Sequence, residues 1–247
     1  MITLNSDAAS TSLSKTTKAI LNEYGIKLNK NLGQNYLIDR NKRDQIIQFG
    51  NLTKDDVVLE IGPGIGTLTI ELAKRVKKVI AIEQDSNICQ ILENRLKKEN
   101  IDNVELINDD ALNVEFPKFD KIISNLPYQI SSPITFKFLN YDFQLAILMY
   151  QKEFASRMNG KVGSKDYSRL SAMLYFKCDV DLLTGVSAES FIPKPKVDST
   201  VVRLTPKLPE LNGQLKHLNI NEINEKDFKT YSKFVKALFL SLIHISE

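Results

Sequence analysis

Short apolar runs alternate along most of the chain with segments whose apolar residues recur at helical spacing. The runs predict strands at residues 57–61, 79–83, 104–107, 122–123 and 145–150. The segments before and between them predict helices at residues 39–50, 67–75, 86–98 and 132–140. Apolar strands that alternate with helices are typical of a parallel sheet covered on both faces. The pattern therefore predicts an α/β fold with a doubly wound, mostly parallel sheet.

The two ends of the chain differ from this pattern. Residues 1–24 form an expected extension, polar and disordered to about residue 12 and then helical up to Gly25. After a helix at 153–158, strands at 174–183 and 197–204 predict an antiparallel hairpin at the sheet edge, since the prolines between them exclude a helix. We place the main domain at residues 25–206 and a small helical region at 207–247, helical over 222–243.

Composition narrows the class of protein. The chain has 247 residues, 43% of them hydrophobic and 26% charged, as expected of a soluble globular protein. A net charge of +3 is compatible with a nucleic-acid partner but is too small to indicate one. No apolar run approaches the ~18 residues of a membrane span. The first residues lack a signal-peptide pattern, so we expect a cytoplasmic protein without a membrane partner.

Cysteine and histidine usage argues against two classes of site. Cys89 and Cys178 lie far apart, which fits a reducing compartment. The only histidines, His217 and His244, lie late in the chain. A Ser-His-Asp hydrolase and a His-ligated metal enzyme are therefore disfavoured, and no metal is expected.

Unusual residues follow four of the predicted strands: a glycine loop at 62–66, Glu83, Asp110 and Asn125. In a doubly wound sheet, ligands bind beyond the carboxyl ends of the strands. Glu60 and Glu83 could instead cap helices or pair with surface lysines. The shared position of all four features favours one ligand site.

The spacing of the glycines indicates the class of ligand. Gly62, Gly64 and Gly66 do not form the dinucleotide fingerprint, which would need a glycine at Thr67, and no Walker lysine follows. Glu83, about 20 residues after the first glycine, can accept both ribose hydroxyls. Asp110 suits an adenine amino group. A nucleoside without a diphosphate is favoured, hence S-adenosylmethionine, with the glycines letting the backbone approach its methionine part.

The stretch Asn125-Leu126-Pro127-Tyr128 has two interpretations. Taken alone, it fits a turn that ends a strand. At the ligand edge, it fits a base-binding site: Asn125 and the Leu126 carbonyl offer acceptors to an amino group, and Tyr128 offers a stacking face. The early stretch 27–39 likewise reads either as a surface loop or as a loop that contacts a polar ligand or RNA phosphates.

Four motifs occur together in order: 32–39 (Leu-Gly-Gln-Asn-Tyr-Leu-Ile-Asp), the glycine loop, 125–128 and 191–199 (Phe-Ile-Pro-Lys-Pro-Lys-Val-Asp-Ser). As a set they resemble the ribosomal RNA adenine dimethyltransferases of the KsgA and Dim type over residues 25–206. The amino-acid sequence at residues 130–135 and 149–151 resembles the archaeal branch of the family most. The resemblance implies a class I S-adenosylmethionine-dependent methyltransferase fold. It also implies transfer of two methyl groups to N6 of each of two adjacent adenosines near the 3′ end of small-subunit rRNA, by a monomer acting on a pre-ribosomal small subunit.

The resemblance also assigns residues. The implied S-adenosylmethionine contacts are Asn35, Leu37, Gly62, Gly64, Glu83, Asp110 and Asn125, so the early loop becomes a lid on the cofactor. The residues implied in catalysis are Asn125, Leu126, Pro127 and Tyr128. Tyr128 and Phe191 are the implied base-stacking rings. From the sequence pattern alone, Phe191 would be a core residue.

RNA has to be held mainly through its phosphates. The candidate contacts are Lys27, Lys30, Arg40, Lys42, Arg43, Lys161, Lys165, Arg169, Lys194 and Lys196. A solvated charged surface is the alternative for about half of them. The tail departs from the family, which continues after residues 234–239 into a basic cluster and further helices, so we expect a shortened C-terminal region without RNA contacts.

Two other functions stay open. A large-subunit rRNA adenine methyltransferase of the erythromycin-resistance type shares the fold and a similar Asn-x-Pro-Tyr motif. The amino-acid sequence at residues 193–197 nevertheless favours the small-subunit type. A ribosome-assembly or transcription factor could keep the fold without the activity. The complete set of cofactor residues argues against the second.

Overall fold

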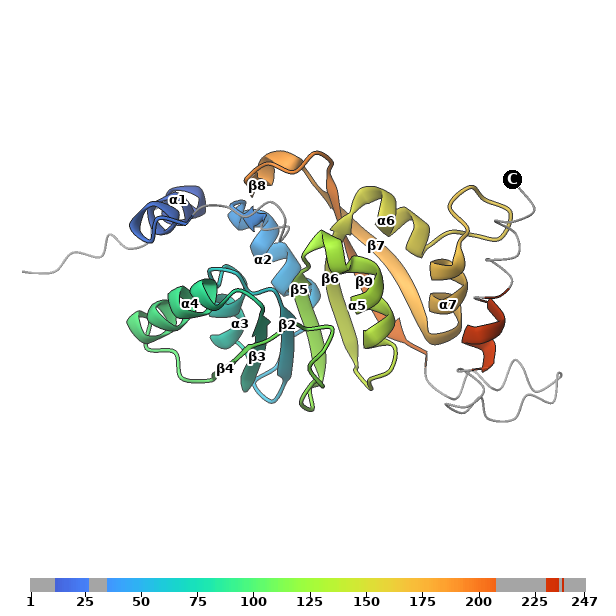
Figure 1. The fold of residues 1–247 in the computed structure, drawn as a ribbon, viewed down its shortest axis with the longest axis horizontal. Coiled ribbons are helices and arrows are strands. Elements are labelled where there is room, and N and C mark those ends of the chain that lie inside the picture. The colour runs from blue at the N-terminus through green and yellow to red at the C-terminus, as the bar shows by residue number, and fades with distance from the viewer. Residues whose placement is uncertain (1–11, 27–34, 208–229, 236, 238–247) are drawn as a thin grey trace, which may run out of the picture.

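The computed structural model describes residues 12–26, 35–207, 230–235 and 237, and a twisted sheet forms the centre of this part (Figure 1). Its seven strands lie in the order β4-β3-β2-β5-β6-β9-β7. Their bounds are β2 Val57–Ile61, β3 Lys78–Glu83, β4 Val104–Asn108, β5 Lys121–Asn125, β6 Leu145–Gln151, β7 Cys178–Val186 and β9 Ser199–Pro206. The first five are parallel, and β9 pairs antiparallel with β6 and β7. The predicted parallel sheet with an antiparallel edge hairpin is confirmed.

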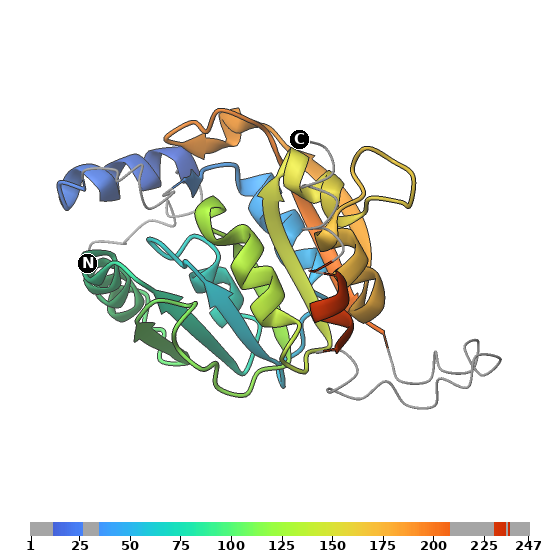
Figure 2. The same ribbon diagram turned by 45° about the vertical axis from the view of Figure 1, so that its right-hand side comes forward.

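Helices cover both faces of the sheet. One face packs against α5 Ser131–Phe138, α6 Lys152–Met158 and α7 Arg169–Lys177. The other packs against α2 Arg40–Phe49, α3 Thr69–Ala73 and α4 Ser86–Lys98. Figure 2 shows α5 in front of the strands and α2 behind them. Since strand side chains alternate, Leu59 and Ile61 belong to the first core and Val58 to the second.

The strand order reverses between β2 and β5. These strands pair only at Val58 with Lys121 and at Leu59 with Ile122. Further along, the buried Ser124 hydroxyl accepts a hydrogen bond from Ile61 N at 2.6 Å and donates one to Ile61 O at 2.9 Å. A side chain thus replaces the ladder at the carboxyl ends of the two strands, which is the topological switch point where ligands bind in such sheets.

Three further elements lie at this end of the sheet. β1 Tyr36–Leu37 pairs antiparallel with β8 Phe191–Ile192, so part of the expected early loop is a strand. The predicted first helix, α1 Leu13–Glu23, is confirmed and is capped by Ser12. Its Ile20 and Leu21 pack in a cluster with Tyr36, with Ile65 of the glycine loop and with Ile88 and Ile91 of α4.

Some predicted boundaries are wrong. The strand predicted at 174–183 begins only at Cys178, because α7 extends through Lys177. A capping box between Ser168 and Ser171 starts that helix, and Leu170, Met173 and Leu174 then pack into the core. The helix predicted at 67–75 is limited to α3.

The chain ends are only partly covered. The predictions for residues 1–11 and for most of 208–247 lie outside the described residues. Residues 230–235 and 237 are helical, as predicted, and Tyr231 stacks on Phe176 of α7. Among the described helices, none combines the length and the apolar character that a membrane crossing requires.

Candidate active site

A cavity opens beyond the carboxyl ends of β2, β3 and β5. All seven predicted cofactor residues line it: Asn35, Leu37, Gly62, Gly64, Glu83, Asp110 and Asn125. Leu126, Pro127 and Tyr128 also line it. The structure therefore brings three of the four motifs, together with Glu83 and Asp110, to one cavity, while their roles toward a ligand stay predictions.

The glycine loop needs its glycines. Gly62 and Gly64 have φ angles of +67° and +55°, which side chains rarely adopt. A Cβ on Gly64 would lie 2.9 Å from Tyr36 Cε1, and one on Gly62 would lie 3.0 Å from the Pro127 ring. The loop is thus packed between β1 and the 125–128 motif. Arg95 of α4 donates a hydrogen bond to Ile65 O and so ties the loop to α4.

The two acids after the strands are held by backbone amides. Glu83 accepts hydrogen bonds from Gly64 N at 3.2 Å and Asp85 N at 3.1 Å. Burial raises the pKa of Glu83, and these amides oppose that effect. Asp110, which is partly exposed, accepts a bond from Leu112 N at 2.8 Å. Both carboxylates therefore have fixed positions at the cavity wall.

Two buried cavity-lining atoms have no hydrogen-bond partner among the described residues: Glu60 Oε2 and Tyr36 Oη. Glu60 is 2% exposed, and burial raises its pKa to about 8. Burial also raises the pKa of Tyr36. Leaving a buried polar atom unpaired costs about 1–3 kcal/mol. The alternatives for Glu60, a helix cap or a lysine partner, are not seen here, and a polar ligand in the cavity is favoured.

The 125–128 motif begins at the last residue of β5 and leads into the 3-10 helix η3 Tyr128–Ile130. Asn125 Nδ2 donates a hydrogen bond to Asn35 O at 3.0 Å, which leaves Oδ1 as the acceptor of this side chain. Tyr128 Oη lies 2.6 Å from the Ser199 hydroxyl. The motif is thus both a turn and part of the cavity wall, so the two interpretations are compatible.

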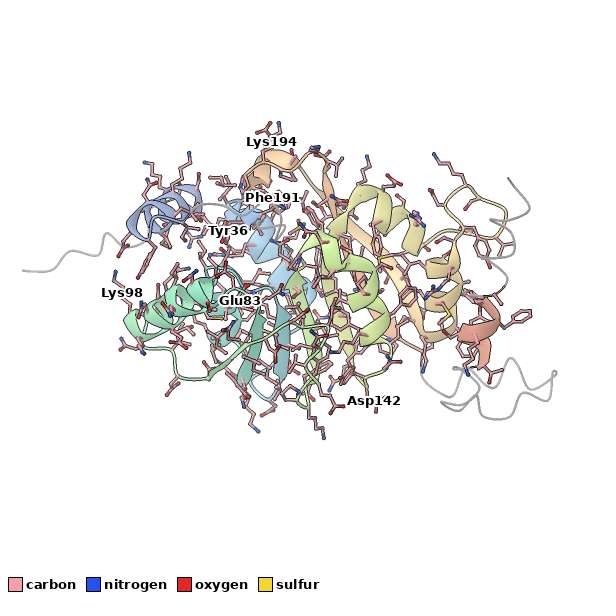
Figure 3. All side chains as sticks on the ribbon, in the orientation of Figure 1. Tyr36, Glu83, Lys98, Asp142, Phe191 and Lys194 are labelled. Atoms are coloured by element: carbon pink, nitrogen blue, oxygen red, sulfur yellow. The ribbon has the colours of Figure 1, made fainter. Side chains whose placement is uncertain are left out.

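Phe191 does not line the cavity. It is 2% exposed, sits opposite Leu37 in the β1–β8 pair and packs in a cluster with Val186 and Val201. Figure 3 shows Phe191 above Tyr36, and Tyr36 above Glu83. This is the core position that the sequence pattern alone indicated. Its stacking role stays a prediction.

The candidate RNA contacts have different environments. Lys161 and Lys165 are exposed in the loop between α6 and α7, and Arg40 and Lys196 are exposed too. Lys194 pairs with Glu189, Lys42 bonds Thr184, and Arg169 stacks over Phe136. Arg43 is 9% exposed and pairs with Asp44, so it is not a surface cation. Lys27 and Lys30 lie outside the described residues.

Sequence reasoning missed several residues at this site. Tyr36 lies inside the 32–39 motif, and its position next to Asn35 is the signal that could have identified it. Ser124 and Ser199 act through contacts between distant segments, and no local pattern marks them.

Among the described residues, no group of three or more His, Cys, Asp or Glu side chains could hold a metal ion.

Comparisons with known proteins agree with this geometry. The family model described as ribosomal RNA adenine dimethylase matches residues 25–244. A protein of Methanosphaera stadtmanae, described as "Probable ribosomal RNA small subunit methyltransferase A", is 54% identical over 77% of this chain and 70% of its own length. The crystal structure of a dimethyladenosine transferase from Plasmodium falciparum is 38% identical with a TM-score of 0.71, over 82% of this chain and 70% of that one. The 23S rRNA methyltransferase ErmE is 30% identical with a TM-score of 0.66, over 82% and 78%.

Proposed function

Since the chain belongs to the ribosomal RNA adenine dimethylase family, we propose that it methylates N6 of adenines in small-subunit rRNA with S-adenosylmethionine as the methyl donor. One observation carries the proposal: Asn125, whose amide nitrogen is tied to Asn35 and whose oxygen is left to accept, lines the same cavity as Glu83 and Asp110. The protein acts as a monomer on a pre-ribosomal small subunit.

The residues present fit this cofactor. Glu83 would accept bonds from the ribose hydroxyls and Asp110 from the adenine amine, while Gly62 and Gly64 leave room for the methionine part. Asn35 and Leu37 would close over it. The unpartnered Glu60 Oε2 and Tyr36 Oη require polar partners, which a charged amino acid moiety and its bound water can supply.

The chain's own residues act mainly by positioning. When bound, S-adenosylmethionine supplies an electrophilic methyl group. The target amine is a poor nucleophile because its lone pair is delocalised into the ring. Asn125 Oδ1 and the Leu126 carbonyl would accept bonds from its N–H groups, and this would favour a tetrahedral nitrogen with an available lone pair. The proton leaves to water afterward, so no titrating base is needed.

A base must leave its stack to reach this site. Tyr128 would hold one face of the base, and the bond to Ser199 fixes the tilt of that ring. Phe191, which is buried in β8, would cover the other face only after the β1–β8 pair moves. The same pocket then has to readmit the monomethylated amine, which has one donor fewer.

We further propose that the product is N6,N6-dimethyladenosine at two adjacent positions near the rRNA 3′ end. The match to a dimethyladenosine transferase supports dimethylation, and the archaeal relative's description supports the small subunit. The large-subunit alternative has weaker support, because ErmE is less similar in both identity and TM-score than the dimethyladenosine transferase.

Labelled methyl transfer to immature small subunits and to large-subunit RNA separates these functions. We expect label only in the small subunit, as N6,N6-dimethyladenosine by mass spectrometry. Label in large-subunit RNA alone would indicate the erythromycin-resistance type. Binding to small subunits without transfer to either RNA would indicate an assembly factor.

A further inference from the structure

Lys137, in the last turn of α5, clamps the chain segment that follows Asp110. Its Nζ donates hydrogen bonds to Ala111 O at 2.8 Å, to Leu112 O at 3.2 Å and to Val114 O. A lysine ammonium has three donors, so all three are used on this one segment. The ammonium also lies 4.3 Å from the centre of the Phe116 ring.

The segment that Lys137 holds fixes the position of the Asp110 side chain. Asp110 Oδ1 accepts from Leu112 N at 2.8 Å and Oδ2 from Asn113 Nδ2 at 3.3 Å. The Asp110 carbonyl accepts from Val114 N at 3.1 Å. Each partner belongs to the stretch whose carbonyls Lys137 holds. The carboxylate therefore depends on Lys137 for its position, although the two side chains share no hydrogen bond.

The helix that carries Lys137 also starts at the base site. η3 begins at Tyr128, and α5 follows from Ser131. The face of α5 around Ile134 and Phe138 is fully buried, so the helix is a rigid connection between the two regions. A displacement at the Lys137 end would move the Asp110 segment and leave Asn125, on β5, in place.

We propose that Lys137 is a positioning residue for the cofactor, which fixes Asp110 against the exocyclic amine of the adenine ring. This inference rests on the proposed function, in which Asp110 contacts that amine. Arginine cannot replace lysine fully, because a planar guanidinium does not converge on three carbonyls as an ammonium does. Methionine at position 137 keeps the approximate length of the lysine side chain and removes all of its hydrogen-bond donors.

Calorimetric titration with S-adenosylhomocysteine tests the proposal in K137M, K137R, D110A and a control, K118M, at an exposed lysine. We expect K137M to raise Kd about tenfold, the loss of one well-made hydrogen bond to the ligand. K137R should raise Kd by less than K137M does, and D110A should raise it at least as much as K137M. K118M should leave Kd unchanged. At saturating cofactor, kcat of K137M should stay near wild type.

A second ligand separates positioning from loosening of the fold. In S-inosylhomocysteine an oxygen replaces the adenine amine, so wild type and K137M should bind it with similar Kd. Unchanged affinity of K137M for S-adenosylhomocysteine, or an equal loss for both ligands, overturns the proposal. Should K137M fail to fold, the same comparison with K137R decides.

The reference measurements separate this inference from the proposed function. Wild-type protein that binds no S-adenosylhomocysteine would overturn the proposed function itself. Tight binding by D110A would overturn only the adenine contact and, with it, the role of Lys137.

Discussion

The Asn125 side chain donates a hydrogen bond to the backbone carbonyl of Asn35, 3.0 Å away across 90 residues of sequence. The bond joins the end of β5, where the base would react, to the segment before β1, which would cover the cofactor. It also fixes the orientation of the amide, because the nitrogen is used and the oxygen is left to accept.

Asn125→Ala should therefore lower methyl transfer by at least ~100-fold, as loss of a preorganised polar group at a reacting centre does. S-adenosylhomocysteine should still bind, though more weakly, because the tie to Asn35 is lost. Transfer of labelled methyl groups and calorimetry measure the two effects. Asn140→Ala, at an exposed site beyond α5, is the control. An unchanged rate for Asn125→Ala would reject its role in catalysis.

Tyr128→Ala should cause a severe loss of activity in a folded protein. Stacking of a base on an aromatic ring is worth about 1–3 kcal/mol, so kcat/KM for RNA should fall by roughly 10- to 100-fold. Tyr128→Phe keeps the ring and loses only the 2.6 Å bond to Ser199, so we expect at most about a fivefold loss, and the same for Ser199→Ala. Near-UV circular dichroism reports folding. An unfolded Tyr128→Ala protein would instead support a role in the core.

Glu60 should make stability depend on pH. Burial raises its pKa from 4.5 to about 8, so the folded protein keeps a proton that the unfolded chain releases above about pH 4.5. The contribution of this group is therefore greatest below pH 4.5 and is lost as pH rises toward 8. Relative to Glu60→Gln, which cannot ionise, the free energy of unfolding of wild type should fall by about 3 kcal/mol between pH 5 and 8.

Urea unfolding of the ligand-free proteins at both pH values checks this prediction. Glu93→Gln, on the exposed side of α4, is the matched control and should follow wild type. Parallel pH profiles for wild type and Glu60→Gln would contradict a raised pKa of the buried carboxyl at position 60.

Most of the fold follows from the sequence because the strands of the parallel sheet are short, largely apolar segments bounded by clear helix and turn signals. The prediction fails where one pattern fits two structures. Residues 174–177 are apolar enough for a strand, yet the capping box at Ser168 and core packing by Leu174 make them helical. Periodicity does not separate these cases.

The candidate site divides in the same way. Residues next to a strand end, such as Glu83 and Asn125, could be predicted because position alone brings them to the ligand edge. Ser199 and Lys137 could not, because their partners lie 71 residues and about 25 residues away in the chain. The burial of Phe191 opposite Leu37 agrees with the core position that the sequence pattern indicates, while its stacking role stays a prediction.

Lys161 and Lys165 should bind RNA phosphates. Both are exposed in the loop between α6 and α7, which also contains the largely exposed Val162. Each phosphate contact releases counterions, so the double variant Lys161→Gln/Lys165→Gln should weaken RNA binding and reduce the slope of log Kd against log salt by about 2. Since neither lysine lines the cavity, kcat at saturating RNA should stay near wild type. The matched control is Lys97→Gln/Lys98→Gln at the far end of α4 (Figure 3), which removes the same charge and should leave the slope unchanged. Equal slopes for the two double variants would mean that the loop is an ordinary solvated surface, because only a local contact distinguishes it from α4.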